Sequence, residues 1–219
     1  MATKAKLLIK KKIWVPIVGP EWSQEQYIGE THVVEPKQAL GKTVVASLAS
    51  LTGDSQKQQA NLKFVINKVS AEKLGTDVVA YILSPSSVKR LVRRSKKKMD
   101  DSFIAQSQDG KKVRLKYVLI AKGKAKGSVT AALRRQAREF LAKETSSQSL
   151  DSLFQALIQH RVQKGLSMAL KKTYPLAVAE LRWVELVKDE KTRKSPVVQV
   201  AEVVEPVKEE QPPVAAVEA

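Results

Sequence analysis

The first half of the chain has alternating hydrophobic and polar positions that predict β-strands. Leu62, Phe64 and Ile66 occupy every second position, which is the period of a half-buried strand. Other apolar and β-branched runs are bounded by turn signals such as Asp109-Gly110. The predicted strands cover residues 13–18 as an edge strand containing Pro16, then 43–51, the stretch around 62–67, 78–83, 111–121 and 178–187; residues 21–42 have no assignable pattern.

Helical spacing dominates the last third of the chain. Ser128 is a suitable N-cap for a helix over residues 128–144, and two further helices are predicted over 150–161 and 162–172. An earlier short helix is predicted to begin at Ser84-Pro85, since serine caps helices and proline suits their first turn. Val88, Leu91 and Val92 would form its buried stripe, and a lysine-rich loop would follow.

Strands followed by helices predict an α+β fold, with mostly antiparallel strands and C-terminal helices packed against them. Residues 1–12 are expected to be a basic arm that is disordered without a partner. Residues 13–188 are expected to form a single domain. Residues 189–219 are rich in Val, Pro and Glu and are expected to be a disordered acidic tail.

The charge is unusual for a chain with an ordinary hydrophobic content of 43%. The 219 residues carry a net charge of +17, and because residues 189–219 contribute −3, residues 1–188 carry +20. A segment with this charge is expected to bind a polyanion such as a nucleic acid; an anionic membrane surface is the alternative partner. No apolar run approaches the ~18 residues needed to span a bilayer, and no signal peptide is recognisable near Met1.

The densest basic run is residues 89–98, in which seven of ten residues are cationic and none is acidic. A solvated face or a nuclear-localisation-like run is the simplest alternative, but other basic segments accompany it. The arm, a basic strand, a glycine-lysine loop and a helix add further cations. The predicted phosphate ligands are Lys10, Lys11, Lys12, Lys89, Arg90, Arg93, Arg94, Lys96, Lys97, Lys98, Lys112, Arg114, Lys116, Lys122, Lys124, Lys126, Arg134, Arg135 and Arg138.

Residues suited to catalysis are few. The chain lacks cysteine, which excludes disulfides and thiolate sites and suits an intracellular protein. His32 and His160 lack metal-ligand spacing, and the Gly41-Lys42-Thr43 tripeptide lacks the upstream glycine of a phosphate-binding loop. We therefore expect no metal, no cofactor and no enzyme activity. The acids Asp100, Asp101 and Asp109 could belong to a metal-dependent nuclease, but they serve more simply as turn residues and local counter-charges.

Base stacking by aromatic side chains is also not expected. Tyr117 lies on the apolar face of its strand, and Trp14, Trp22 and Trp183 fall in apolar contexts. The basic residues therefore indicate contacts to the RNA backbone and shape more than to base edges.

Five stretches occur in the order seen in one family. They are GPEWSQEQYIGET at residues 19–31, LTGDSQKQQANLKF at 51–64, RLVRRSKKKMDDSF at 90–103, QDGKKVRLKYV at 108–118 and KTYPLAVAELR at 172–182. In these stretches the chain resembles the archaeal and eukaryotic small-subunit ribosomal protein family S-three-Ae, also called e-S-one, and its length suggests the archaeal form. The resemblance implies a β-barrel-like core with packed helices, a place on the small-subunit platform near the mRNA exit, and no catalysis.

The sequence thus predicts a structural constituent of the small ribosomal subunit in the cytoplasm. Its expected partners are small-subunit ribosomal RNA, neighbouring small-subunit proteins and mRNA near the exit, and no membrane. An RNA-processing enzyme using the same basic surface is one alternative. A nucleic-acid-binding or chaperone module acting outside the ribosome is another.

Overall fold

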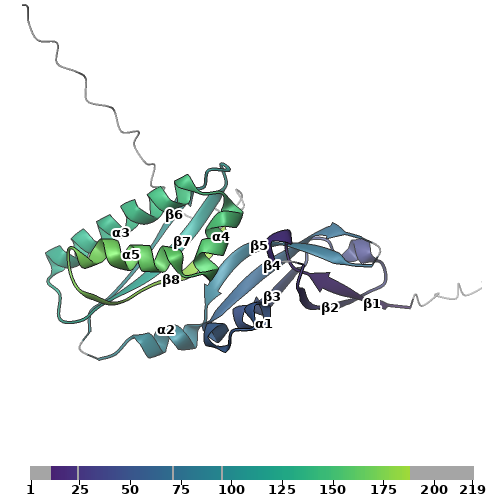
Figure 1. Ribbon diagram of the computed structural model, residues 1–219, viewed down its shortest axis with the longest axis horizontal. Coiled ribbons are helices and arrows are strands. Elements are labelled where there is room, and N and C mark those ends of the chain that lie inside the picture. The colour runs from purple at the N-terminus through teal and green to yellow at the C-terminus, as the bar shows by residue number, and fades with distance from the viewer. Residues whose placement is uncertain (1–10, 24, 71, 95, 188–219) are drawn as a thin grey trace, which may run out of the picture.

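The computed structural model describes residues 11–23, 25–70, 72–94 and 96–187, which contain eight strands and five α-helices (Figure 1). The strands are β1 (Ile13–Val18), β2 (Tyr27–Val33), β3 (Thr43–Ser47), β4 (Ala60–Val69), β5 (Leu74–Leu83), β6 (Lys98–Gln106), β7 (Lys112–Ala121) and β8 (Leu176–Leu186). The helices are α1 (Leu48–Thr52), α2 (Pro85–Leu91), α3 (Gly127–Ser147), α4 (Leu150–Ile158) and α5 (Arg161–Lys171), with 3-10 turns η1 (Glu21–Ser23), η2 (Pro36–Ala39) and η3 (Ser55–Gln59).

All eight strands belong to one mostly antiparallel sheet, and β5 is the strand that two halves share. The order is β2-β1-β5-β8-β7-β6, with β4 on β5 and β3 on β4. The beginning of β5 pairs with β1 in parallel, its end pairs with β8, and β4 runs along its whole length. We call residues 11–83, with β1–β5 and α1, the N-terminal lobe, and residues 84–187, with β6–β8 and α2–α5, the C-terminal lobe.

The sheet is open, so the expected barrel-like core is wrong in that respect, whereas the α+β class is confirmed. In the described chain β2 pairs only with β1, β3 only with β4 and β6 only with β7, so the sheet has three edge strands. The chain leaves β3 after Ser47, whose hydroxyl accepts a hydrogen bond from the Ala49 N–H and caps α1. Helix α1 lies beside β2 and buries Leu48 and Leu51, so a helix instead of strand pairing closes this side.

The core of the C-terminal lobe forms between β6–β8 and helices α3, α4 and α5, which cover one face of the sheet (Figure 1). Val113, Leu115, Tyr117 and Leu119 of β7 point into it, as their alternation predicts. Full burial of side chains of this size stabilises the fold by about 1.5–3 kcal/mol each. On the opposite face α2 packs through Val88 against apolar residues of β5 and β7.

Several predicted boundaries differ from the structure. The strand expected over residues 43–51 ends at Ser47, and β2 and β6 were not predicted. The helix expected to start at Ser128 starts at Gly127, with Lys126 at the cap position. Ser84 is the N-cap residue of α2, but its hydroxyl bonds that of Ser86 and not the helix backbone.

The predictions for the arm fall mostly, and those for the tail entirely, outside the described residues. The division into arm, single domain and tail stays a prediction. None of the helices in residues 11–187, apart from the three undescribed positions, is long and apolar enough to cross a membrane.

Candidate nucleic-acid interface

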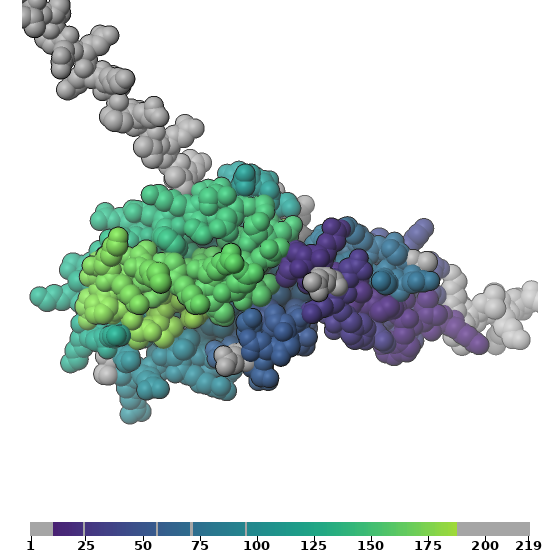
Figure 2. All heavy atoms as spheres, viewed as in Figure 1, coloured from purple at the N-terminus to yellow at the C-terminus, as the bar shows by residue number. Residues whose placement is uncertain are grey.

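The positive charge of the described chain is concentrated in one lobe. Residues 11–83 contain 8 Lys and Arg against 7 Asp and Glu, a net charge of +1. Residues 84–187 contain 23 against 8, a net charge of +15. Figure 2 shows the two lobes as opposite ends of the molecule, the N-terminal lobe in purple and blue and the C-terminal lobe in teal and green. Any polyanion is therefore attracted mainly to the C-terminal lobe.

Three loops of the C-terminal lobe are tied together by hydrogen bonds at the end remote from the N-terminal lobe (Figure 1). The Ala121 N–H donates to the Lys97 carbonyl at 3.0 Å, and the Lys122 N–H donates to the Pro175 carbonyl at 3.2 Å. The Tyr174 hydroxyl donates to the Lys124 carbonyl at 3.3 Å. Side chains of residues distant in sequence thus share one surface. We call this surface the basic end: Arg93, Arg94, Lys96, Lys97, Lys122, Lys124, Lys126, Lys171 and Lys172.

The basic end has no acidic residue in the sequence segments that form it. Residues 84–99, 110–138 and 161–179 contain no Asp or Glu. All nine side chains of the basic end are exposed except Lys96, which is half-buried. Seven of them are predicted phosphate ligands, whereas Lys171 and Lys172 were missed because they lie at the end of an ordinary amphipathic helix. Their position is set by the turn through Tyr174, which no local pattern reveals.

Helix α2 presents Lys89 and Arg90 to solvent while Val88 is buried, as predicted. These two cations extend the positive surface along the helix that leads to the basic end. Lys98, at the start of β6, forms an ion pair with Asp100 at 2.5 Å. The charge of Lys98 is therefore partly neutralised by Asp100 of the same strand, whereas the preceding loop contains no acidic residue.

The predicted basic row on β7 lies on the sheet face opposite α3–α5, but it is not an open row of cations. Lys116 Nζ lies 5.2 Å from the ring centroid of Trp183, and the indole N–H of that residue donates to Glu185. Arg114 is half-buried and opposes Glu185 in the β7–β8 register. Lys112 and Arg114 both take part in interactions within the protein. This row can supplement the basic end, but its charge is already partly compensated.

The three predicted arginines of α3 differ in role. Arg134 and Arg135 are exposed. Arg138 instead forms a two-pronged contact with Asp101 of β6, with Nε–Oδ2 at 2.5 Å and Nη2–Oδ1 at 2.8 Å. The Tyr117 hydroxyl lies 3.1 Å from both Asp101 Oδ2 and the Arg134 carbonyl. Arg138 therefore fastens α3 to the sheet, and its guanidinium is not free for phosphate.

This network shifts the pKa of its members. Burial raises the pKa of Asp101, but hydrogen bonds from Arg138 and from the Ser102 N–H, with the arginine charge, outweigh it and hold the pKa below the ordinary 3.8. The hydrogen bond to Asp101 raises the pKa of Arg138. The ion pair therefore persists at neutral pH.

The acids that raised the nuclease alternative each have a structural partner. Asp101 binds Arg138, and Asp100 binds Lys98. Asp109 Oδ2 accepts a hydrogen bond from the Leu150 N–H at 2.8 Å, at the start of α4. Among the described residues no group of three or more His, Asp or Glu side chains could hold a metal ion.

The predicted arm residues that the structure describes lie far from the basic end. Lys11 and Lys12 are exposed just before β1, and Lys10 is outside the described residues. Next to them the apolar context expected for Trp14 is wrong, because its side chain is 65% exposed. Its ring stacks on His32 with centroids 4.6 Å apart. Strand alternation explains this, since Val15 and Ile17 are the residues of β1 that point inward.

One half-buried carboxyl lies where β8 separates from β5. Glu180 lines a cavity of about 190 Å3 together with Tyr81 and His160, and its Oε2 atom has no hydrogen-bond partner among the described residues. Burial raises the pKa of Glu180 to about 7. No pattern in the sequence pointed to this group.

Comparisons with known proteins agree with the resemblance seen in the sequence. The model of the Ribosomal S3Ae family matches residues 2–190. Among curated proteins, the small ribosomal subunit protein eS1 of Saccharolobus islandicus is 30% identical over 179 residues, which cover 82% of this chain and 86% of that protein. The proteins of the same name from Halorubrum lacusprofundi and Methanobrevibacter smithii are 28% and 27% identical, covering 81% and 78% of this chain and 82% and 89% of the relatives.

Proposed function

Because the chain belongs to the Ribosomal S3Ae family, we propose that it is a structural component of the small ribosomal subunit and binds ribosomal RNA through the phosphates that face its basic end. The observation that carries the RNA contact is the convergence of three acid-free loops on one surface. Lysine and arginine side chains there neutralise phosphates and release counterions, which dominates protein–RNA affinity. The exposed cations of α2 and α3, which are Lys89, Arg90, Arg134 and Arg135, add positive charge on the two faces of the sheet beside this end.

We also propose a position on the platform near the mRNA exit, with mRNA and neighbouring small-subunit proteins as further contacts. The resemblance of five sequence stretches to the family supports this part. The alternative of an RNA-processing enzyme does not stand, since this family of ribosomal proteins is non-enzymatic. For the alternative of a module outside the ribosome, sedimentation of cell extract decides: we expect most copies in the small-subunit peak.

A matched pair of variants tests the RNA contact. Lys171→Gln with Lys172→Gln removes two charges from the basic end, and Lys37→Gln with Lys42→Gln removes two exposed charges from the N-terminal lobe. Affinity for small-subunit ribosomal RNA is measured over a series of salt concentrations. The first variant should bind more weakly and lower the salt slope by about 0.7–0.9 for each phosphate that it no longer neutralises.

The control should change neither quantity by a comparable amount. Equal losses of affinity in both variants would mean that only net charge matters and that the basic end is not the contact surface. A flat salt response of the unaltered protein would overturn the phosphate proposal as a whole.

A further inference from the structure

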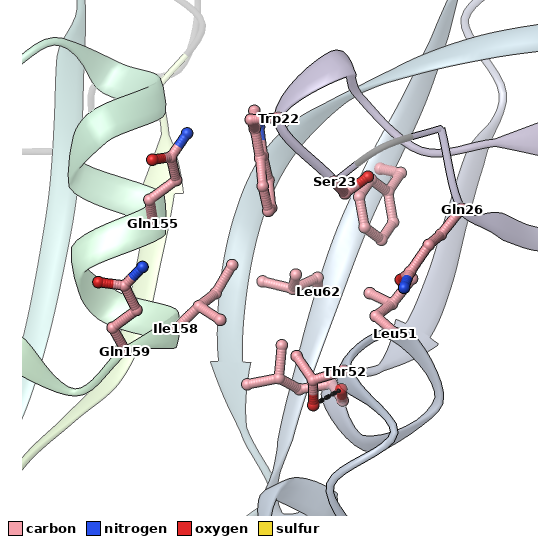
Figure 3. A pocket seen from close by; sticks show the side chains of 11 residues that line it. Trp22, Ser23, Gln26, Leu51, Thr52, Leu62, Gln155, Ile158 and Gln159 are labelled. Carbon is pink, nitrogen blue, oxygen red and sulfur yellow. Dashed lines mark hydrogen bonds between the residues drawn. The ribbon is translucent and has the colours of Figure 1, made fainter.

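A cavity of about 270 Å3 lies between the two lobes (Figure 3). Its walls come from η1, α1 and β4 of the N-terminal lobe and from the end of α4 in the C-terminal lobe. It is larger than a water site, since a water molecule occupies roughly 30 Å3 of the liquid, yet smaller than the ~300–1,000 Å3 of sites for drug-sized ligands. Its size therefore suits one ring-sized group.

The chemistry of the walls favours a flat, uncharged group with hydrogen-bonding edges. Leu62, Phe64 and Ile158 provide an apolar floor, and Trp22 stands beside them as an aromatic wall. The Trp22 Nε1–H is buried and has no acceptor among the described residues, although a buried N–H ordinarily finds one. What Trp22 offers to the cavity is therefore its ring and not this N–H group.

The rim of the cavity supplies amides. Gln155 of α4 and Gln159, the C-cap residue of that helix, lie on one side and Gln26 on the other, with Trp22 and Leu62 between them (Figure 3). A glutamine amide offers both donors and an acceptor, which is the combination that pairs with base edges. Among the residues that the structure describes, no charged side chain lines the cavity.

Cations nevertheless lie beside the cavity. Gln159 at the rim is followed directly by His160 and Arg161. Burial lowers the pKa of His160, and the charges of Lys57 and Lys164 lower it further, so both lysines lie near this imidazole. Lys57 and His160 line the neighbouring cavity that contains Glu180, and Lys57 also pairs with Asp54 at 3.6 Å, which compensates part of its charge. A neutral aromatic cavity with cations at its side matches the two parts of a nucleotide, whose base is neutral and whose phosphate is anionic.

We propose that this cavity between the lobes receives an unpaired base of the bound RNA, stacked on Trp22 and contacted at its edges by Gln155 and Gln159, while Lys57, Arg161 and Lys164 face the flanking phosphates. This inference rests on the proposed RNA-binding function and adds base contact at a second place, away from the basic end. A side chain of a neighbouring protein is the competing occupant. The exposed cations Arg161 and Lys164 favour the nucleotide, because a nearby positive charge does not stabilise an apolar side chain.

Fluorescence of Trp22 tests the proposal directly. Trp14→Phe with Trp183→Phe leaves Trp22 as the one tryptophan of the 219-residue chain. The probes are single-stranded homopolymers of A, C, G and U and the A–U duplex at equal phosphate concentration, and fluorescence anisotropy of labelled RNA reports binding separately. At least one single strand should quench Trp22 saturably, and the duplex should bind without quenching it.

Rim variants add a second measurement. Gln155→Ala with Gln159→Ala should lower the affinity for the quenching strand about tenfold, as expected when hydrogen bonds to a base are removed. The matched control, Gln38→Ala with Gln58→Ala, removes two exposed amides from other turns of the N-terminal lobe and should leave the affinity unchanged.

The possible failures are distinguishable. Salt-dependent binding of single strands by anisotropy without quenching of Trp22, or equal quenching by the duplex, overturns the base pocket and leaves the proposed function standing. Absence of all RNA binding overturns both. Quenching that appears only in assembled small subunits, and not with RNA alone, assigns the cavity to a neighbouring protein and also overturns the proposal.

Discussion

Replacing Asp101 by Asn should destabilise the fold far more than the same change one residue earlier. The Asp101 carboxylate receives two hydrogen bonds from Arg138 and one from the Ser102 N–H, and its side chain is only 13% exposed. Hydrogen bonds to charged groups contribute about 1.5–3 kcal/mol each, but Arg138 is 36% exposed and water compensates part of the effect. We therefore expect Asp101→Asn to lower the free energy of unfolding by about 2–3 kcal/mol.

The control is Asp100→Asn on the same strand. Its side chain is 42% exposed and pairs with Lys98, and pairs as exposed as this contribute about 0–1 kcal/mol. Urea unfolding at neutral pH measures both variants. By thermal unfolding the Asp101 variant should melt roughly 4–12 °C lower, at about 2–4 °C per kcal/mol for a body of this size.

The pH dependence gives a second check on the same residue. Because the folded-state pKa of Asp101 lies below its ordinary 3.8, its contribution is complete above that value and is lost as the pH falls through the folded pKa. The difference in free energy of unfolding between the unaltered protein and Asp101→Asn should therefore become smaller as the pH falls. Equal stabilities of the Asp100 and Asp101 variants, or a gap that persists in acid, would refute the account of this ion pair.

Three further outcomes are expected. Because the pKa of Glu180 is raised to about 7, the folded state loses stability as the pH rises from the ordinary pKa of 4.5 to 7. At pH 8 the free energy of unfolding of Glu180→Gln, measured with urea, should therefore exceed that of the unaltered protein by about 1–3 kcal/mol, and in acid the two should be equal. Arg138→Gln should lower the melting temperature with little effect on RNA affinity. Arg135→Gln, at an exposed position of the same helix, should weaken RNA binding and leave the melting temperature nearly unchanged; a large loss of RNA affinity in Arg138→Gln would contradict the structural role of Arg138. Arg93→Gln with Arg94→Gln should weaken RNA binding with the fold intact, and the double Lys variant should recover only part, because the charge returns without the planar fork; full recovery in a filter-binding assay would show that charge alone matters there.

Local sequence patterns predicted those strands and helices that bury only one of their faces. The alternation in β7 and the stripe of α2 identified which residues point inward, because each faces one layer of the core. Strand β6 was missed because Asp100 and Asp101 resemble turn residues. Asp101 in fact occupies an inward position between Met99 and Phe103, and this is possible only because Arg138, 37 residues later, meets it.

The candidate surface was only partly predictable for the same reason. The exposed cations of residues 89–97 and 122–126 were evident from composition, but their meeting with Lys171 and Lys172 depends on hydrogen bonds between loops distant in sequence. Arg138 appeared equivalent to Arg134 and Arg135 because its partner lies on another element. The cavity beside Trp22 combines four separate segments, none of which carries a motif of its own.

The uneven distribution of charge also gives the described chain a large electric dipole along its long axis. In the field of an RNA a dipolar protein turns during diffusion, so that productive encounters begin with the positive pole in front, and this orientation raises association rates at low ionic strength. The near-neutral pole then points away from the RNA. Its exposed Trp14 would face solvent at that moment, accessible to a protein that binds later during assembly.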